Sequence, residues 1–318
     1  PLAISRRSSS NFRMFWRIEA RTHVYVLTME GSDSGGPVVE SEMVIFDILG
    51  EPTEIGRFLV PTSASLDLDP IRRLLFVYGG LAESISVFDV GDDDPMELGG
   101  SPISLREWYP EDNNWAFSLR NLTVEPWSAR IYGGRPQGTL SELIALDYPA
   151  VVPAEGTRYA QLADMAQVSP VADGFDLSVD YEERPSLLEA HTALPDPSTG
   201  AVFLTARAWN GSSSTDLVTP LDADLALGPG CGDPSDPFCF YRYYSGGEAS
   251  FELMSDGEAC LDATHKVVVG TTVDFIDDEA EGSVVFFRYE EDLRMSPWLS
   301  ESGGNLTAGI YPISASCH

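Results

Sequence analysis

The feature that most constrains the fold of this chain is a short pattern that recurs five times along it. In each copy a brief apolar stretch ends in an acidic residue, a turn follows, and a run of β-branched and aromatic residues comes next. The acidic residues of successive copies lie 50 to 71 residues apart. In chain order they are Glu19, Asp69, Glu125, Asp196 and Asp262. A repeat of this length is typical of folds assembled from supersecondary units.

The clearest copy shows why the pattern ends one strand and begins another. Asp69 is followed by Pro70, and the apolar run 74–80 comes after a three-residue gap. Proline cannot donate to a sheet ladder, and the acid can accept hydrogen bonds from turn amides, so the pair closes a hairpin. Each copy continues into a second apolar run, and these runs are residues 43–48, 85–90, 143–148, 216–219 and 284–289. A fourth strand is predicted at 54–60 in the first unit and at 101–105 in the second.

Four antiparallel strands in each repeat, without a long helical period, predict an all-β chain of the β-propeller type. About five four-stranded blades are visible in the sequence. The irregular spacing would also suit a β-sandwich or jelly roll, which stays as the alternative. A propeller ring must close, so either the two termini share one blade or the chain is part of a larger propeller.

The stretch from Leu66 to Val77 and the run 85–90 resemble the YVTN/lactonase-like β-propeller superfamily, in which such strand-turn-strand units form each blade. The resemblance covers roughly residues 17 to 290. It implies the fold and transfers no catalytic residues, because its signature is structural.

The repeats define the predicted organisation of the chain. Residues 1–16 are interpreted as an N-terminal extension or closing strand, and residues 17–318 as the propeller, with long excursions at 150–190 and 207–250. Function often lies in such excursions. The second carries the aromatic residues that we predict as a binding surface: Phe238, Phe240, Tyr241, Tyr243 and Tyr244. The alternative is that these aromatic rings pack back onto the blades.

Four cysteines allow three disulfide pairings if all are oxidised. Cys231 and Cys239 flank a turn-rich loop, so a local bridge between them is geometrically easy and leaves Cys260 to pair with Cys317. A zinc site would need histidines or closely spaced cysteine pairs, which the sequence lacks. The chain begins at Pro1, so we interpret it as a processed form or a fragment, and its expected location is extracellular, at the cell surface or periplasmic.

The charge of the chain is strongly negative, with 50 acidic residues against 19 basic ones and a net charge of −31. Phosphate backbones would be repelled, so nucleic acid is not an expected partner. The sequence has no apolar run long enough to span a bilayer as a helix. No cofactor is expected, with calcium as the alternative at a cluster of acids formed by Asp277, Asp278, Glu279 and Glu281. Their spacing does not match that of an EF-hand loop.

These observations leave three hypotheses for function. The first is a non-catalytic binding propeller outside the cytoplasm, whose face loops contact a protein or a glycan. The second is a lactonase-like or sugar-cleaving propeller hydrolase with carboxylates in its channel. The third is a structural subunit of a surface assembly, whose function is self-association. No phosphate loop, nucleophile elbow or dinucleotide fingerprint is present, so the sequence itself favours no enzyme class.

Overall fold

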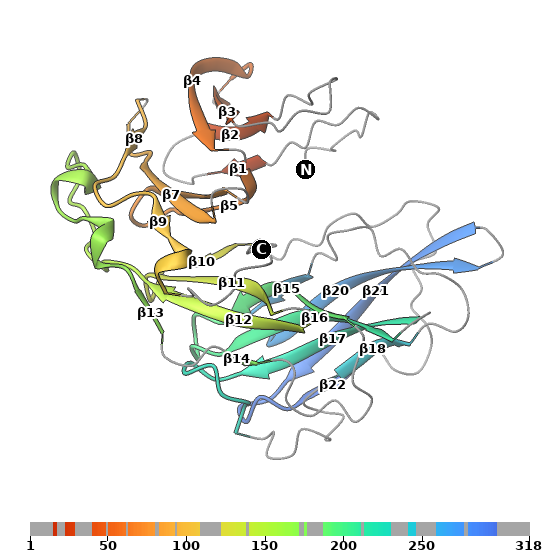
Figure 1. Cartoon of the computed structure of the whole chain (residues 1–318). Coiled ribbons are helices and arrows are strands. Elements are labelled where there is room, and N and C mark those ends of the chain that lie inside the picture. Colours follow the sequence, from red (N-terminus) through yellow and green to blue (C-terminus); the bar gives the residue numbers. More distant parts are fainter. Residues whose placement is uncertain are drawn as a thin grey trace. The chain divides into compact units, whose positions relative to one another are not determined.

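The computed structural model contains β-strands and three short 3-10 helices in the part of the chain that it describes, and that part holds no α-helix. The described residues are 15–17, 23–28, 40–48, 50–61, 63–79, 83–92, 94–108, 122–137, 140–171, 175–176, 187–210, 213–229, 241–245, 259–276 and 279–297. The strands form five antiparallel sheets that follow one another along the chain (Figure 1). The chain divides into two compact units, which are described separately.

The first unit, Pro1–Glu111 with Tyr148–Val168, holds two sheets. The first sheet runs in the order β1 (Phe15–Arg17), β2 (His23–Thr28), β3 (Glu40–Asp47) and β4 (Thr53–Pro61). The second runs in the order β5 (Ser63–Asp69), β6 (Leu74–Gly79), β7 (Ser84–Asp89) and β8 (Met96–Glu97), with β9 (Ile103–Ser104) also paired to β7. The 3-10 helices are η1 (Leu105–Glu107), η2 (Tyr159–Gln161) and η3 (Met165–Gln167).

The second unit, Asp112–Asp147 with Ser169–His318, holds three sheets. The third sheet runs in the order β10 (Thr123–Glu125), β11 (Arg130–Gln137), β12 (Leu140–Asp147) and β13 (Ser169–Pro170), with β14 (Phe175–Asp176) also paired to β12. The fourth sheet is β15 (Leu187–Pro195), β16 (Val202–Asn210), β17 (Ser213–Leu221) and β18 (Tyr241–Ser245). The fifth is β19 (Ala259–Asp262), β20 (Val267–Ile276), β21 (Glu279–Tyr289) and β22 (Met295–Pro297).

The fourth sheet is buried on both faces. Val202 and Leu204 of β16 pack in a cluster with Tyr132 and Leu143 of the third sheet. Phe203, which lies between them, packs in a second cluster with residues of the fifth sheet. Alternate side chains of one strand therefore contact two different sheets, which explains why such strands read as continuous apolar runs. In the first unit, a third cluster joins the first two sheets in the same way.

Sheets of this kind are propeller blades. Each is built from consecutive strands paired in chain order, and each packs face to face with a neighbouring sheet of its unit. The predicted all-β fold with about five visible four-stranded blades is therefore confirmed, and the predicted fourth strand at 54–60 is β4. No helix among the described residues is long and apolar enough to cross a membrane.

The two predicted excursions contain regular elements. The 150–190 segment includes η2, η3, β13, β14 and the start of β15, and the 207–250 segment includes β17 and β18. At the other end of the chain, β1 begins at Phe15, inside the stretch interpreted as an extension or closing strand. The domain boundaries proposed from the sequence stay predictions.

Candidate functional site

Four of the repeat acids, Asp69, Glu125, Asp196 and Asp262, lie at the corner turns that join the first and second strands of their blades, whereas Glu19 lies outside the described residues. Asp69 Oδ1 accepts hydrogen bonds from the backbone amides of Ile71 and Arg72, at 2.8 and 2.9 Å. Asp196 Oδ1 accepts from the amide of Ser198 at 2.8 Å. Asp262 Oδ1 accepts from the amide of His265 at 3.0 Å. The predicted role of the acid, acceptance from turn amides, is confirmed at these three corners.

Each of four corner turns ends with a residue in the left-handed conformation. The φ angles are +60° at Arg73, +58° at Ala129, +74° at Gly200 and +55° at Lys266. Only glycine adopts this conformation without a steric cost. The turn geometry is therefore kept in all four repeats even though three of them carry a side chain at this position.

A tyrosine hydroxyl supplies a further hydrogen bond to three of the corner acids. Tyr148 donates to Asp69 at 2.7 Å, and Tyr289 donates to Asp196 at 2.8 Å. At the third corner, Tyr132 donates to Glu125 at 2.9 Å. Tyr148 and Tyr289 each stand at the end of a second apolar run of the sequence repeat, so a tyrosine shared by two repeats was the signal that could have revealed this contact.

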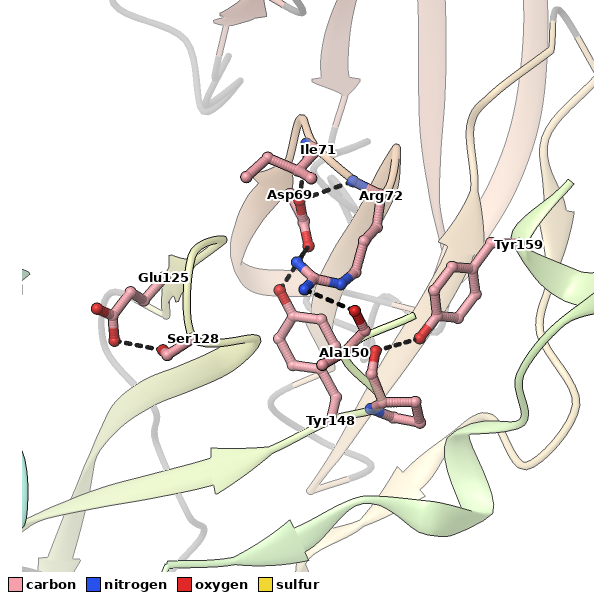
Figure 2. A network of polar contacts seen from close by, with 9 residues as sticks. Asp69, Ile71, Arg72, Glu125, Ser128, Tyr148, Ala150 and Tyr159 are labelled. Carbon is pink, nitrogen blue, oxygen red and sulfur yellow. Dashed lines mark hydrogen bonds and ion pairs between the residues drawn. The ribbon is translucent and has the colours of Figure 1, made fainter. Parts of the chain in front are cut away.

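The corner at Asp69 forms the most extensive network, which Figure 2 shows. Asp69 Oδ2 accepts from Arg72 Nη1 at 2.9 Å as well as from Tyr148, and both members of this ion pair are buried. The second guanidinium nitrogen of Arg72 donates to the carbonyl of Ala150 at 3.1 Å. Beside it, the hydroxyl of Tyr159 donates to the carbonyl of Pro149 at 2.5 Å.

The hydrogen bonds of this network fix the positions of the side chains and backbone segments that they join. The two oxygens of Asp69 accept four hydrogen bonds, which matches the roughly four lone-pair sites of a carboxylate and leaves none for a metal ion or a water nucleophile. Burial raises the pKa of Tyr148, and the adjacent Asp69 carboxylate raises it further. Burial also raises the pKa of Tyr159, to about 12. Both hydroxyls therefore stay protonated and serve as fixed donors at neutral pH.

At Asp196 hydrogen bonding, rather than burial, determines the direction in which the pKa shifts. Burial by itself would raise the pKa of this carboxyl, but hydrogen bonds from Ser198, Tyr289 and Thr199 outweigh it, so the pKa lies below its ordinary value. At Asp262 the hydrogen bond from His265, at 2.7 Å between Nδ1 and Oδ2, lowers the pKa as well. These carboxylates are ionised and paired at neutral pH, like structural acids in other folds.

The segment that follows Tyr148 is fastened to the second blade at several further points. Arg73 donates to the carbonyl of Thr157 at 2.6 Å, and Arg158 donates to the carbonyl of Asp94 at 2.6 Å. Arg158 Nε also lies 3.6 Å from the buried Asp89 Oδ2 and 3.5 Å from Asp92 Oδ2. The backbone around residues 149–160 is thus held in place by buried or partly buried cations.

Three exposed aliphatic side chains belong to residues within two positions of members of this network in the chain. Ile71 is 41% exposed, Val151 45% and Val152 55%. Ile71 precedes Arg72 in the chain and Val151 follows Ala150, so the hydrogen bond between Arg72 and Ala150 links the two backbone segments that carry these side chains. We call Ile71, Val151 and Val152 the corner platform. Figure 2 shows the backbone of Ile71 and Ala150 at the two ends of the Arg72 side chain.

The aromatic residues predicted as a binding surface lie partly outside the described residues. Phe238 and Phe240 are outside them, whereas Tyr241, Tyr243 and Tyr244 belong to β18, the outermost strand of the fourth blade. Their role in binding stays a prediction.

The acids predicted as calcium ligands also lie partly outside the described residues. Asp277 and Asp278 lie outside the described residues, and Glu279 and Glu281 belong to β21. Within the described ranges, no group of three or more His, Cys, Asp or Glu residues could hold a metal ion. The calcium site stays a prediction.

One cysteine, Cys260 on β19, belongs to the described residues, and it is disulfide-bonded. Its predicted partner Cys317, and the predicted pair Cys231 and Cys239, lie outside those residues. The pairing of Cys260 with Cys317 stays a prediction.

No family model matches the sequence, and no curated protein matches it either. Among solved structures, the chain is similar to the hydrazine synthase of Kuenenia stuttgartiensis, at 12% identity over 91% of this chain and 66% of that one, with a TM-score of 0.48. It is similar to a proposed 6-phosphogluconolactonase of Bacteroides uniformis, at 10% identity over 94% and 72% of the two chains, with a TM-score of 0.46. It is also similar to the periplasmic gluconolactonase of Pseudomonas aeruginosa, at 12% identity over 96% and 88%, with a TM-score of 0.41.

Lactonase-like propellers, which the sequence repeat resembles, are therefore among the solved structures similar to this chain. The chain spans 66% of the length of the hydrazine synthase chain. Identities of 10 to 12% transfer no substrate, reaction or partner, because unrelated functions share this fold.

Proposed function

We propose that this chain is a non-catalytic β-propeller that works outside the cytoplasm, at the cell surface or in the periplasm, and binds a protein partner through its corner platform. The observation that carries the proposal is the contrast within the Asp69 corner. The polar groups are buried and paired, whereas Ile71, Val151 and Val152 are exposed on the backbone that those groups hold in place. A held backbone lowers the entropic cost of binding.

The chemistry of the platform favours a protein over a glycan. Its side chains are branched aliphatic groups, which offer apolar area and no hydrogen bonds. A sugar ring presents mainly hydroxyl groups, which would lose their bonds to water against such a surface. An apolar side chain of a partner protein would be buried there without that loss.

The exposed charges of the first unit support a basic partner. Asp92, Asp94 and Glu155 are exposed, whereas the side chains of Arg72 and Arg158 are turned toward acceptors within the protein. With a net charge of −31 on the whole chain, a surface rich in Lys and Arg would be attracted. The affinity should then decrease as salt is added, because exposed charges are screened.

The hydrolase hypothesis receives no support from these corners. A carboxylate that acts as a nucleophile or general base needs an oxygen free to meet the substrate or water. Asp69 has both oxygens occupied, and Asp196 accepts from Ser198, Thr199 and Tyr289. The described acids of the corner turns are therefore suited to holding the blades together.

The proposal is tested by photo-crosslinking from the platform. The full chain, with p-benzoylphenylalanine in place of Val152, is irradiated in a surface extract of its source cells, and the attached polypeptide is identified by mass spectrometry. That polypeptide is then produced, and its affinity is measured by calorimetry for the unmodified chain and for the Ile71→Asp/Val152→Asp double variant. We expect the double variant to bind about 100-fold more weakly, which corresponds to roughly 1.4 kcal/mol at each position.

The matched control is Met96→Asp, which places the same charge at an exposed apolar residue of β8 that is not part of the platform. This variant should bind with unchanged affinity. Circular dichroism checks that all variants keep their strand content. Equal binding by the double variant, or equal weakening by Met96→Asp, would show that the platform is not the contact surface.

A further inference from the structure

The outermost strand of the first blade is unusually long. β4 (Thr53–Pro61) has nine residues. In each of the other four blades the last strand in the sheet order is shorter than β4. These strands are β8 and β13, with two residues each, β22, with three, and β18, with five. Short outer strands protect sheet edges from pairing with other chains. The first blade therefore lacks a protection that the other four have.

The β4 edge is accessible. Among the described strands, only β3 pairs with β4, so the other side of β4 is the edge of its sheet. Leu59 is 63% exposed and Ile55 is 39% exposed. A bulge leaves Ile55 without an opposite residue on β3, but residues 56–60 keep continuous pairing with residues 41–45. Five residues in regular register are close to the usual length of a strand.

Arg57, the one cation of β4, does not protect this edge from pairing with another strand. Arg57 Nη1 bonds Glu42 Oε2 at 2.8 Å, and Glu42 belongs to β3, the inner neighbour. Arg57 Nε bonds Glu54 Oε1 at 2.5 Å. A charge protects an edge strand when an incoming strand must desolvate it. Here the guanidinium is drawn toward β3, away from the edge, and is already paired with two carboxylates.

We propose that the β4 edge, over residues 56–60, accepts an extended segment of a partner protein as an added strand. The unpaired backbone amides and carbonyls of an edge are complementary to the backbone of another strand, which supplies the affinity in this mode of binding. Glu54 of β4 is exposed, and the chain as a whole carries a net charge of −31, so the added segment should alternate apolar residues with Lys or Arg. A second copy of this chain is disfavoured, because each copy carries a net charge of −31.

The test uses the full chain and a synthetic probe, an acetylated ten-residue peptide of alternating Val and Lys. Binding is followed by calorimetry and by hydrogen exchange of the backbone amides, read by NMR. We expect saturable binding, with slowed exchange at every second residue of 56–60, because alternate amides of a strand point toward the edge. A peptide of the same sequence with all of its backbone amides N-methylated carries the same charge, has no amide left to donate from either edge and should not bind.

The Leu59→Lys variant places an unpaired cation on the edge and should weaken binding of the probe by at least about tenfold. Leu162→Lys adds the same charge at an exposed leucine after η2 and should leave the affinity unchanged. Equal binding of the N-methylated peptide, equal binding by Leu59→Lys, or unchanged exchange over residues 56–60 would each overturn the proposal. Self-association of the chain without peptide, with slowed exchange at β4, would also overturn it by making a second copy the occupant. These outcomes do not involve the corner platform, which is tested separately.

Discussion

Replacing Tyr148 by Phe isolates one hydrogen bond of the Asp69 corner, because the change removes the hydroxyl and keeps the ring. The hydroxyl donates to the buried carboxylate of Asp69 at 2.7 Å. Hydrogen bonds to charged groups contribute about 1.5–3 kcal/mol to stability. The ring would keep its contact with Phe76, whose centroid is 4.9 Å away, and with the Arg72 guanidinium, 5.6 Å from its centroid. We therefore expect the free energy of unfolding to fall by about 2 kcal/mol.

The measurement is urea unfolding followed by tryptophan fluorescence and circular dichroism, with the dependence on urea concentration compared between variants. In a thermal scan the same loss corresponds to a decrease in Tm of roughly 3 °C for 318 residues that unfold together. The matched control is Tyr159→Phe, which removes a hydroxyl that donates to the neutral carbonyl of Pro149. Its loss should be smaller, at about 0.5–1.5 kcal/mol.

The reasoning depends on the hydrogen bond between the Tyr148 hydroxyl and the Asp69 carboxylate. If Tyr148→Phe cost no more than Tyr159→Phe, the carboxylate would not be gaining the stronger hydrogen bond that a charged acceptor provides. A double-mutant cycle between Tyr148→Phe and Asp69→Asn supplies the independent check. A coupling energy indistinguishable from zero between these two residues would refute the account of the corner given above.

Two further predictions concern the corner turns and their tyrosines. Gly200→Ala should destabilise the chain by about 1 kcal/mol, because φ is +74° there and an added Cβ would meet only Ala223 at an ordinary 3.4 Å, so the cost lies in the backbone. Lys266→Gly, at a partly buried residue with φ of +55°, should have the opposite sign. Urea midpoints of the two variants that moved in one direction would contradict this. Burial raises the pKa of Tyr159 to about 12, and it also raises the pKa of Tyr132, Tyr148 and Tyr289. The protonated hydroxyls therefore contribute their full stabilisation of the folded chain below pH 10. This contribution is lost as the pH rises from 10 through the pKa values of the folded state. In measurements between pH 8 and 12, the urea midpoint should decrease above pH 10. The decrease should be smaller in Tyr148→Phe than in the unmodified chain.

Local signals made the blades predictable from the sequence. Asp69 with Pro70 ends a strand because of backbone chemistry within four residues, and the structure closes the turn there with hydrogen bonds to Ile71 and Arg72. The runs 74–80 and 85–90 read as strands because they are rich in β-branched and aromatic residues, and in the structure every residue of β6 and β7 is buried. Pairing then extended some strands beyond their apolar part, as in β17, which begins at Ser213 opposite Asn210.

The Asp69 network could not be predicted in the same way, because its members are far apart in the chain. Tyr148 is separated from Asp69 by 79 positions, and Ala150 is separated from Arg72 by 78. Nothing local distinguishes Asp69, Asp89 and Asp196 from the many other acids as ones that become fully buried, since burial depends on what packs over them. The tyrosine at the end of two apolar runs was visible, but its partner in another repeat follows only from the packing of the blades.

The placement of the cations explains how so acidic a chain can bury carboxylates and still keep a negative surface. Arg72, Arg130 and Arg158 each contact a carboxylate and donate to a distant backbone carbonyl, those of Ala150, Ala223 and Asp94. A buried acid is stable only when such donors replace the water that it loses. Each arginine that pairs with a buried acid removes one charge of each sign from the surface, so the excess of 50 acidic over 19 basic residues is not reduced. The surface therefore keeps the negative charge of the chain, and the association rate with a basic partner should fall steeply with ionic strength.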